Sequence, residues 1–501
     1  MTPRRAPTVM LQGTSSSVGK SYLAAGLCRV YARRGLRVAP FKAQNMALNA
    51  AVTPDGLEIG RAQAVQAEAA GVPAEVAMNP ILLKAEGDAR AQVVFMGRPI
   101  GTFSAADYRC LRTSLWPEVK SALDSLRRRF DLVVIEGAGS PAELNLRSGE
   151  LVNMRVAAVA QAPVLLISDI ERGGVFASLI GTLDLLRPTE RARVKGLVVN
   201  RFRGDPQLFR DGVRILERRC GIPVMGVIPH LDIRLPAEDS LDLPRLAAAR
   251  PGALLDVVVV EYPHISNFDD FEPLLDEPEV SVRLASHPGR LGRPDLIILP
   301  GSKTTLADLQ SLRDSGMDDA IIGARAAGTA IMGICGGYQM LGTSIADPLG
   351  FEFQGEARGL GLLPVVTTFQ AHKVTRRCEA TARGGPGLAR NLEGVRLTGY
   401  EIHMGIAQVH GQPLLIRDNR PEGSISEDGL VVGTNVHGLF ANGPFRRALL
   451  GALGTLRGVS LSARRPVLSD PFDRLADALE AALDMAALDA VVGQLAPEGR
   501  G

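Results

Sequence analysis

Short apolar runs recur along the chain, and most of them end in a glycine-rich or polar turn. Runs of this length are typical of buried strands in a parallel sheet, which is covered on both faces. Apolar residues at helical spacing follow the first run, and this repetition of strand, loop and helix predicts a mostly parallel, doubly wound α/β sheet. In the first half we predict strands at residues 8–11, 37–41, 91–96, 131–135, 163–168, 196–200 and 223–228, and a helix at 105–130 that Pro117 interrupts or kinks.

A second series of apolar runs follows the segment LDLPRLAAARPG, whose prolines and arginines are typical of a linker. We predict strands at 255–260, 280–285, 296–299, 329–334 and 430–434, and therefore a second α/β unit. The predicted organisation is a first domain at 1–240, a linker at 241–252, a second domain at 253–450 and a C-terminal helical extension at 451–501.

The C-terminal extension contains the start signal of a helix, because Asp470 directly precedes Pro471. Apolar residues then repeat at helical spacing, and the opposite face is acidic. We therefore expect this helix to pack on the protein and not on an anionic membrane.

Composition excludes several classes of function. The 56 basic and 54 acidic residues nearly cancel, and aromatic residues make up only 4%, which argues against a nucleic-acid partner. Five scattered cysteines do not form a disulfide framework or a metal-binding pattern. The chain has no run of about 18 apolar residues that could span a membrane. We expect a cytoplasmic protein with neither a nucleic-acid nor a membrane partner.

The segment MLQGTSSSVGKS at 10–21 joins the first predicted strand to the first predicted helix. Such a turn directs backbone N–H groups and the positive end of the helix dipole at one place, which suits a polyphosphate. Lys20 would reach the β- and γ-phosphates, and the Ser21 hydroxyl would bind Mg²⁺. The first glycine lies one residue further upstream than in the usual motif, so the loop is a variant. The predicted ATP-binding loop consists of Gly13, Thr14, Ser15, Ser16, Ser17, Val18, Gly19, Lys20 and Ser21.

Two further charged residues follow predicted strands of the first domain. Lys42 comes after the strand at 37–41, and Glu136 comes after the strand at 131–135. Because ligands collect at the carboxyl ends of parallel strands, we expect both side chains to face the phosphate loop. Glu136 is then a candidate ligand of the magnesium ion that accompanies the nucleotide.

Cys335 lies between a predicted strand and a helix and is followed by Gly336 and Gly337. Small residues around such a turn are typical of a nucleophile elbow, which exposes a reactive side chain. The backbone N–H groups of Gly336 and Gly301 are candidates for an oxyanion hole. Of the seven histidines, His437 follows the strand at 430–434 and is our candidate base, with His403 as the second choice.

The chain resembles the glutamine-hydrolysing cobyric acid synthases in a series of motifs. In the first half these are MLQGTSSSVGKS, APFKAQNMALN, EIGRAQAVQAEA, MNPILLK, VIEGAGSPAELNL, SDIERGGVFA and VNRFRGD. In the second half they are LPGSKTT, GICGGYQMLG, GYEIHMG and NVHGLF. The resemblance implies an N-terminal P-loop domain similar to dethiobiotin synthetase and a C-terminal class I-type glutamine amidotransferase domain.

The resemblance also implies an activity, that of a glutamine-hydrolysing carbon–nitrogen ligase. The expected reaction is the amidation of the b, d, e and g carboxylates of adenosylcobyrinic acid a,c-diamide, with glutamine as nitrogen donor and ATP with Mg²⁺ as activator. By resemblance, Lys20 and Lys42 would stabilise the transferring phosphoryl group, and Asn200 would read the adenine. Ser21, Glu58 and Glu136 would hold Mg²⁺, while Cys335 and His437 would release ammonia from glutamine.

One position departs from the wider glutaminase pattern. Those enzymes commonly carry His-x-Glu, whereas the residue two after His437 is Leu439. Either another group orients the imidazole, with Glu401 as one candidate, or the glutaminase is slow until the two domains couple.

Two alternative functions remain open. A cobyrinic acid a,c-diamide synthase would differ in the carboxylates that it amidates. A regulatory P-loop ATPase with an inactive glutaminase module would be a scaffold. Such ATPases carry an extra lysine early in the loop, and Ser15 at that position counts against this alternative.

Overall fold

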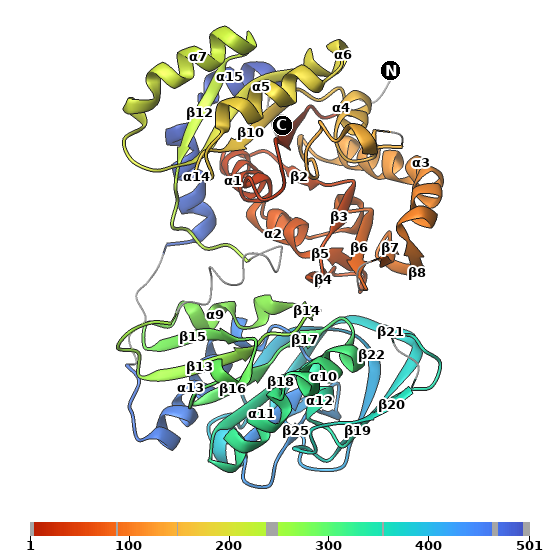
Figure 1. The fold of residues 1–501 in the computed structure, drawn as a ribbon, viewed down its shortest axis with the longest axis vertical. Coiled ribbons are helices and arrows are strands. Elements are labelled where there is room, and N and C mark those ends of the chain that lie inside the picture. Colours follow the sequence, from red (N-terminus) through yellow and green to blue (C-terminus); the bar gives the residue numbers. More distant parts are fainter. Residues whose placement is uncertain are drawn as a thin grey trace, which may run out of the picture.

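The computed structural model describes residues 5–86, 89–147, 149–236, 249–352, 355–462 and 469–493. The chain forms two α/β domains, one above the other in Figure 1. Most of the predicted linker, residues 241–248, lies outside the described residues. Among the described residues, no helix has both the length and the apolar character needed to cross a membrane.

The first domain is built on a six-stranded parallel sheet, as the apolar runs predict. Its strand order is β12-β11-β10-β1-β9-β2. Side chains of β1 alternate between two cores, because Val9 and Leu11 pack with one set of helices and Met10 with the other. The strands are β1 (Thr8–Gly13), β2 (Val38–Phe41), β9 (Leu132–Glu136), β10 (Val164–Asp169), β11 (Val194–Phe202) and β12 (Val224–Pro229).

Helices cover both faces of this sheet, which confirms the doubly wound prediction (Figure 1). Pro117 does not interrupt the predicted helix, since α3 continues through it, while the alternative of a kink there stays a prediction. The helices are α1 (Lys20–Arg33), α2 (Arg61–Ala69), α3 (Ala105–Arg129), α4 (Met154–Ala160), α5 (Val175–Leu185), α6 (Pro188–Arg191) and α7 (Arg210–Cys220).

Small strands between β2 and α3 form a region that the apolar pattern largely misses. Only the strand at 91–96 is predicted, and it is β7 of a four-stranded sheet ordered β3-β6-β7-β8. In Figure 1 this region lies at the side of the first domain that faces the second. The strands are β3 (Gln44–Met46), β4 (Ala50–Val52), β5 (Glu58–Gly60), β6 (Ile81–Ala85), β7 (Arg90–Phe95) and β8 (Arg98–Ser104).

The second domain has its own six-stranded sheet, ordered β15-β13-β16-β18-β26-β25 and parallel except for β25. All five predicted strands are present. The sheet and its helices are β13 (Leu255–Val260), β15 (Val280–Ala285), β16 (Leu296–Leu299), β18 (Ala330–Ile334), β25 (Ser424–Ile425), β26 (Val431–Thr434), α9 (Glu272–Leu275), α10 (Thr305–Asp314), α11 (Met317–Ala326), α12 (Gly336–Leu341) and α13 (Gly443–Arg457).

A long hairpin, β21 with β22, dominates a further sheet beside the second domain's core. A short antiparallel pair, β14 with β17, lies near the carboxyl ends of the main strands. These elements are β14 (Ile265–Ser266), β17 (Gly301–Ser302), β19 (Ser344–Asp347), β20 (Gly355–Arg358), β21 (Val365–Ala382), β22 (Arg396–Val409), β23 (Leu415–Arg417) and β24 (Arg420–Glu422).

The C-terminal segment returns to the first domain. Because α13 runs through residue 450, we place the end of the second domain after Arg457. Helices α14 (Pro471–Ala482) and α15 (Met485–Val492) then pack against α1 and β12, and Leu475 and Leu479 enter the core beside α1. Asp470 caps α14 as predicted, by accepting a hydrogen bond from the backbone N–H of Phe472 at 2.8 Å.

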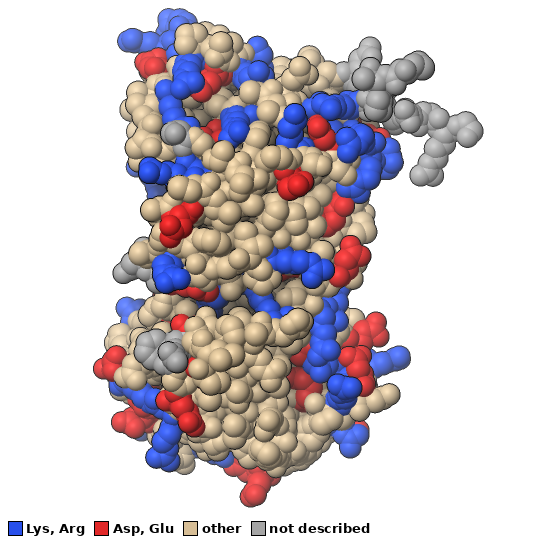
Figure 2. All heavy atoms as spheres, turned by 90° about the vertical axis from the view of Figure 1, so that its right-hand side faces the viewer, with Lys and Arg blue, Asp and Glu red and all other residues tan. Residues whose placement is uncertain are grey.

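Opposite charges line the contact between α14 and α1. Arg29 pairs with Asp473 at 2.8 Å, and Arg33 pairs with Asp477 at 2.6 Å. The acidic face of the extension therefore packs on the protein, as the sequence predicts. Figure 2 shows basic and acidic side chains interspersed above and below the constriction between the domains.

Apolar burial and surface charge contribute unequally to this contact. Leu479→Ala empties a fully buried position on α14, and we expect the free energy of unfolding to fall by about 2–5 kcal/mol. Asp477→Ala removes an ion pair whose carboxylate side chain is 65% exposed. The free energy of unfolding should therefore fall by less than about 1 kcal/mol. Urea unfolding followed by circular dichroism measures both, and a larger loss for Asp477→Ala would contradict this ranking.

Candidate active sites

The phosphate loop connects β1 to α1 through backbone shapes that favour glycine. Gly19 has φ of +95°, and Ser17 also lies in the left-handed region at +57°. A Cβ on Gly13 would lie 2.8 Å from the Lys20 ammonium nitrogen and 2.8 Å from the Ser15 carbonyl oxygen. The loop therefore closes tightly around Lys20, whose ammonium group donates to Ser15 O at 2.8 Å and to Gly139 O at 3.2 Å.

Glu136 brings the predicted polar residues of the first domain together. Its Oε1 accepts from the Ser21 hydroxyl and from the Lys42 ammonium group, each at 2.8 Å. Its Oε2 accepts from the Gln66 amide at 2.7 Å. Gln66 was missed by the sequence analysis, although it lies within EIGRAQAVQAEA, one of the motifs that carry the resemblance.

The donor set of this cluster fits magnesium. Mg²⁺ in nucleotide sites is usually held by one or two protein oxygens together with phosphate oxygens and waters. The Ser21 hydroxyl and the Glu136 carboxylate lie within hydrogen-bond distance of each other beside the loop. They are therefore the residues of this chain that could hold the ion.

A cavity of about 580 Å³ opens in front of the phosphate loop, large enough for a nucleotide. Lys20, Ser21, Lys42 and Glu136 line it. Asn200 also lines it, and its amide donates to the carbonyl of Val18 at 2.8 Å. The structure thus places Asn200 at the loop, while its role in reading adenine stays a prediction.

Glu58 lies outside this cluster, against its predicted role as a third magnesium ligand. It is buried and forms ion pairs with Lys84 at 2.9 Å and with Lys373 of the second domain at 2.5 Å. Burial alone would raise the pKa of Glu58, but the two ammonium groups lower it to about 2. In this structure the carboxylate is held by these two cations, and the role of Glu58 as a magnesium ligand stays a prediction.

Cys335 occupies a sharp turn between β18 and α12. Its φ of +52° is strained for a residue with a side chain, as expected of a nucleophile elbow. A Cβ on Gly337 would lie 2.0 Å from the carbonyl oxygen of Leu299, so that position requires glycine. Gly336 is the first residue of α12, where a backbone N–H has no partner within the helix.

The loop that carries Gly301 lies beside the same turn. A Cβ on Gly301 would lie 3.2 Å from Cε1 of His437, and one on Gly336 would lie 2.8 Å from the backbone nitrogen of Ser302. The two predicted oxyanion-hole residues are therefore in neighbouring segments around the candidate nucleophile. Their donation to an oxyanion stays a prediction.

His437 is buried and oriented by a carboxylate. Its Nδ1 lies 2.7 Å from Oδ2 of Asp270, whose other oxygen accepts from the backbone N–H of Gly438 at 2.6 Å. The ring of Tyr400 stacks on the imidazole, with the centroids 5.1 Å apart. Burial alone would lower the pKa of His437, but Asp270 and Cys335 raise it well above its usual value. This arrangement suits a nucleophile, a base and an orienting acid in Cys335, His437 and Asp270, and these roles stay predictions.

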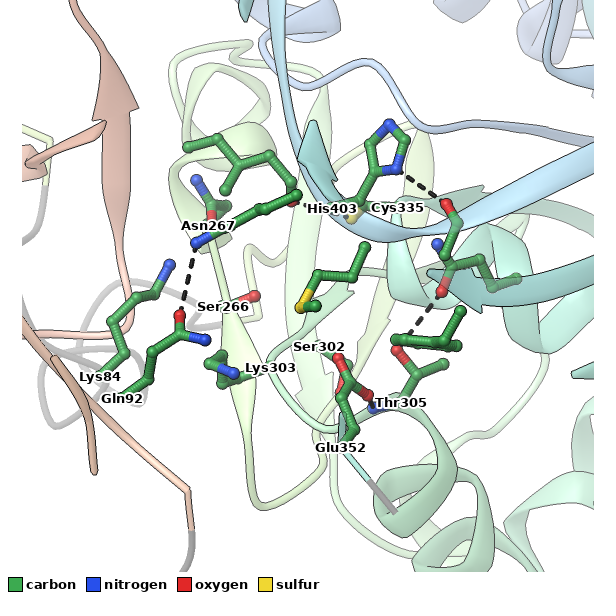
Figure 3. Close-up of a pocket in the computed structure, with 16 residues that line it drawn as sticks. Lys84, Gln92, Ser266, Asn267, Ser302, Lys303, Thr305, Cys335, Glu352 and His403 are labelled. Carbon is green, nitrogen blue, oxygen red and sulfur yellow. Dashed lines mark hydrogen bonds between the residues drawn. The ribbon is translucent and has the colours of Figure 1, made fainter. Parts of the chain in front are cut away.

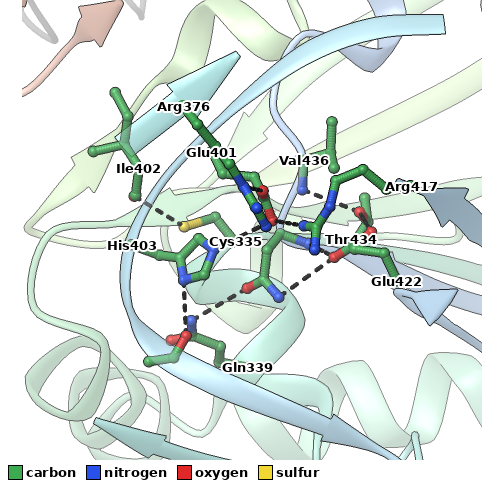
Figure 4. Close-up of polar contacts among 12 residues, drawn as sticks. Cys335, Gln339, Arg376, Glu401, Ile402, His403, Arg417, Glu422, Thr434 and Val436 are labelled. Carbon is green, nitrogen blue, oxygen red and sulfur yellow. Dashed lines mark hydrogen bonds and ion pairs between the residues drawn. The ribbon is translucent and has the colours of Figure 1, made fainter. Parts of the chain in front are cut away.

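The hypothesis that Glu401 orients His437 is wrong. Glu401 instead forms ion pairs with Arg376 and Arg417, and His403 lies 3.4 Å away, as Figure 4 shows. Asp270 was missed because it belongs to the short helical turn at Phe268–Asp270, far from His437 in sequence. The adjacent acidic pair Asp269-Asp270 is a local signal that could have suggested it.

A narrow cavity of about 40 Å³ reaches Cys335 and is lined by both domains. Lys84 and Gln92 enter it from β6 and β7 of the first domain, as Figure 3 shows. Lys303 and Lys373 line it from the second domain. His403 also lines it, with its Nδ1 2.8 Å from the carbonyl of Gly405.

Comparison with known proteins places both halves in one family. Residues 9–241 match the CobQ/CobB/MinD/ParA nucleotide binding domain, and residues 256–445 match the CobB/CobQ-like glutamine amidotransferase domain. Curated cobyric acid synthases from Sorangium cellulosum and Chloroflexus aurantiacus are each 51% identical. Each alignment covers 97% of this chain, and 98% and 99% of the respective relative. The chain belongs to the cobyric acid synthase family.

Membership of the cobyric acid synthase family confirms two predictions from the sequence. The chain combines a P-loop nucleotide-binding domain with a glutamine amidotransferase domain, and it is a glutamine-hydrolysing ligase. A relative from Desulfitobacterium hafniense, 46% identical over 98% of both chains, bears the same name.

Asp270 should be essential for hydrolysis of glutamine. Asp270→Asn keeps the shape of the carboxylate but removes its charge, so the imidazolium of His437 loses its partner and the pKa of His437 falls. We expect kcat for glutamate release to fall about 10²-fold or more, by analogy with other catalytic triads. A kcat within about twofold of the parent would show that His437 does not depend on Asp270.

Glu136 and Glu58 should respond differently when magnesium is titrated. Glu136→Gln removes the anionic ligand beside Ser21, so more Mg²⁺ should be needed for half-maximal amidation with an ammonium salt as nitrogen source. Glu58→Gln is the matched control and should leave that midpoint unchanged, because Glu58 is bound to lysines. An equal shift of the midpoint in both variants would indicate that Glu58 binds magnesium as Glu136 does.

Proposed function

We propose that this protein amidates the b, d, e and g carboxylates of adenosylcobyrinic acid a,c-diamide, using ATP and glutamine. The observation that carries the proposal is the presence of a phosphate-loop cavity and a Cys–His–Asp constellation in one chain. Relatives over nearly its full length are named cobyric acid synthase. That name favours this activity over the a,c-diamide synthase, and the complete constellation argues against a scaffold with an inactive glutaminase.

The second domain supplies ammonia. His437 takes the proton of the Cys335 thiol, and the sulfur attacks the side-chain carbonyl carbon of glutamine. The N–H groups of Gly336 and Gly301 stabilise the oxyanion that forms. His437 then protonates the leaving nitrogen, ammonia departs and a glutamyl thioester remains. Water hydrolyses the thioester to glutamate and restores the thiol.

The first domain makes the carboxylate reactive. An ionised carboxylate is a poor acceptor for ammonia, so one of its oxygens first attacks the γ-phosphorus of ATP, and ADP leaves. Lys20 and Lys42 line the cavity where negative charge develops on the transferring group. Ser21 and Glu136 would hold Mg²⁺, which neutralises phosphate charge when bound. Ammonia then attacks the acyl carbon, phosphate leaves, and an amide results.

Cys335→Ala separates the two halves of the reaction. Without the thiol, we expect glutamine-dependent amidation to be lost, while amidation with an ammonium salt continues at a rate close to that of the parent. Mass spectrometry of the corrinoid product measures both, because each replacement of oxygen by NH is a unit-mass loss. Loss of both activities, or of neither, would contradict this division, and fewer than four successive losses in the parent would contradict the proposed substrate.

A further inference from the structure

Helix α2 of the first domain reaches both active sites. Near its middle, Gln66 donates to Glu136 at 2.7 Å and to the carbonyl of Ser21 at 3.3 Å. At its first residue, Arg61 forms an ion pair with Asp269 of the second domain at 2.6 Å. The two residues are about 7.5 Å apart along the helix axis. In Figure 1, α2 lies on the side of the first domain that faces the second.

The ion pair of Arg61 lies directly beside the glutaminase constellation. Asp269 is buried, with 2% of its side chain exposed, and it precedes Asp270, the residue that holds His437. Burial raises the pKa of Asp269 above its usual value, although the guanidinium of Arg61 opposes the shift. Two adjacent buried carboxylates repel each other, so the turn that carries them needs a cation close by. Arg61 supplies it from the other domain.

The other support of the imidazole also touches the first domain. The Asn267 amide donates to the carbonyl of Ala50 in β4 and to the hydroxyl of Tyr400, both at 2.9 Å. Tyr400 stacks on His437. The carboxylate that orients the base and the ring that packs on it are therefore both linked to the first domain.

We propose that Arg61 is a positioning residue for the glutaminase centre, supplied by the nucleotide-binding domain. The inference rests on the proposed function, because it assigns Arg61 to the hydrolysis of glutamine at Cys335. Arg61 acts through Asp269 on the turn that carries Asp270, and it does not line the cavity at Cys335. His437 is thus correctly placed only while α2 packs between the nucleotide site and the site at Cys335.

The experiment measures glutamate release by the full-length protein as a function of glutamine concentration. Arg61→Gln should lower kcat about 10- to 100-fold, because small displacements of catalytic groups cost that much, and should leave KM within about twofold. Arg61→Lys keeps the charge and should recover part of the loss. Amidation with an ammonium salt should be unchanged in both variants, since Arg61 is not among the residues that contact the nucleotide cavity.

Arg234→Gln is the matched control. Arg234 also reaches from the first domain to the second, where it donates to the carbonyl of Leu275 at 3.1 Å. It lines the nucleotide cavity and not the cavity at Cys335, so release of glutamate is the readout for this control. Its kcat for glutamate release should stay within about twofold of the parent. An equal fall in Arg234→Gln and Arg61→Gln would indicate general loosening of the interface and would overturn the proposal.

Arg61→Gln leaves the buried carboxylate of Asp269 without its cation, which could prevent folding. A second variant keeps the proposal testable in that case. The double variant Arg61→Gln/Asp269→Asn removes both charges, and its kcat should remain about 10-fold below the parent. A parental kcat in the double variant, or a change in KM alone, would overturn the proposal. Failure of the proposed function is distinguishable, because the parent itself would then release no glutamate or form no amide.

Discussion

Buried or partly buried carboxylates where the two domains meet constrain how the domains dock. Among the described residues, Glu58 and Glu86 of the first domain pair with Lys373 and Lys303 of the second, and Asp269 of the second pairs with Arg61 of the first. Removing one partner of a buried pair costs about 3–5 kcal/mol, because it leaves a charge without compensation. Each pair therefore favours the same docked arrangement. The lysine pairs close the cavity at Cys335, and the Arg61 pair supports the turn beside His437.

The same requirement organises the nucleotide site within the first domain. Glu136 is buried at the end of β9, where it would be unfavourable without donors. Ser21, Lys42 and Gln66 provide these donors from α1, the end of β2 and α2. A single carboxylate thus fixes the relative positions of the groups that surround the phosphate loop. Its contact with Gln66 also fixes α2, the helix whose first residue reaches the second domain.

The sequence predicts features that are local. Apolar runs locate every strand of both main sheets except the short β25. The phosphate loop and the turn at Cys335 are visible because each needs glycine at particular positions in a short segment. Partners across the fold are not visible in this way. Glu58 and Lys373 are separated by 315 residues, and Asp270 and His437 by 167. The docking of the domains decides which charged residues pair, and local spacing in the sequence does not encode that pairing. The packing of α14 on α1 depends on tertiary contacts in the same way.

The error at Glu401 shows what this distinction means for function. Orientation of an imidazole requires a hydrogen-bond acceptor at Nδ1, and the chemistry is indifferent to the element that supplies it. In a His-x-Glu arrangement the carboxylate lies two residues after the histidine. Here Asp270 takes that place from a turn whose neighbour, Asp269, is bound by the other domain. Because the orienting carboxylate lies beside the domain interface, the orientation of the base depends on the contact between the domains. Release of ammonia is therefore linked to the presence of the domain that consumes it.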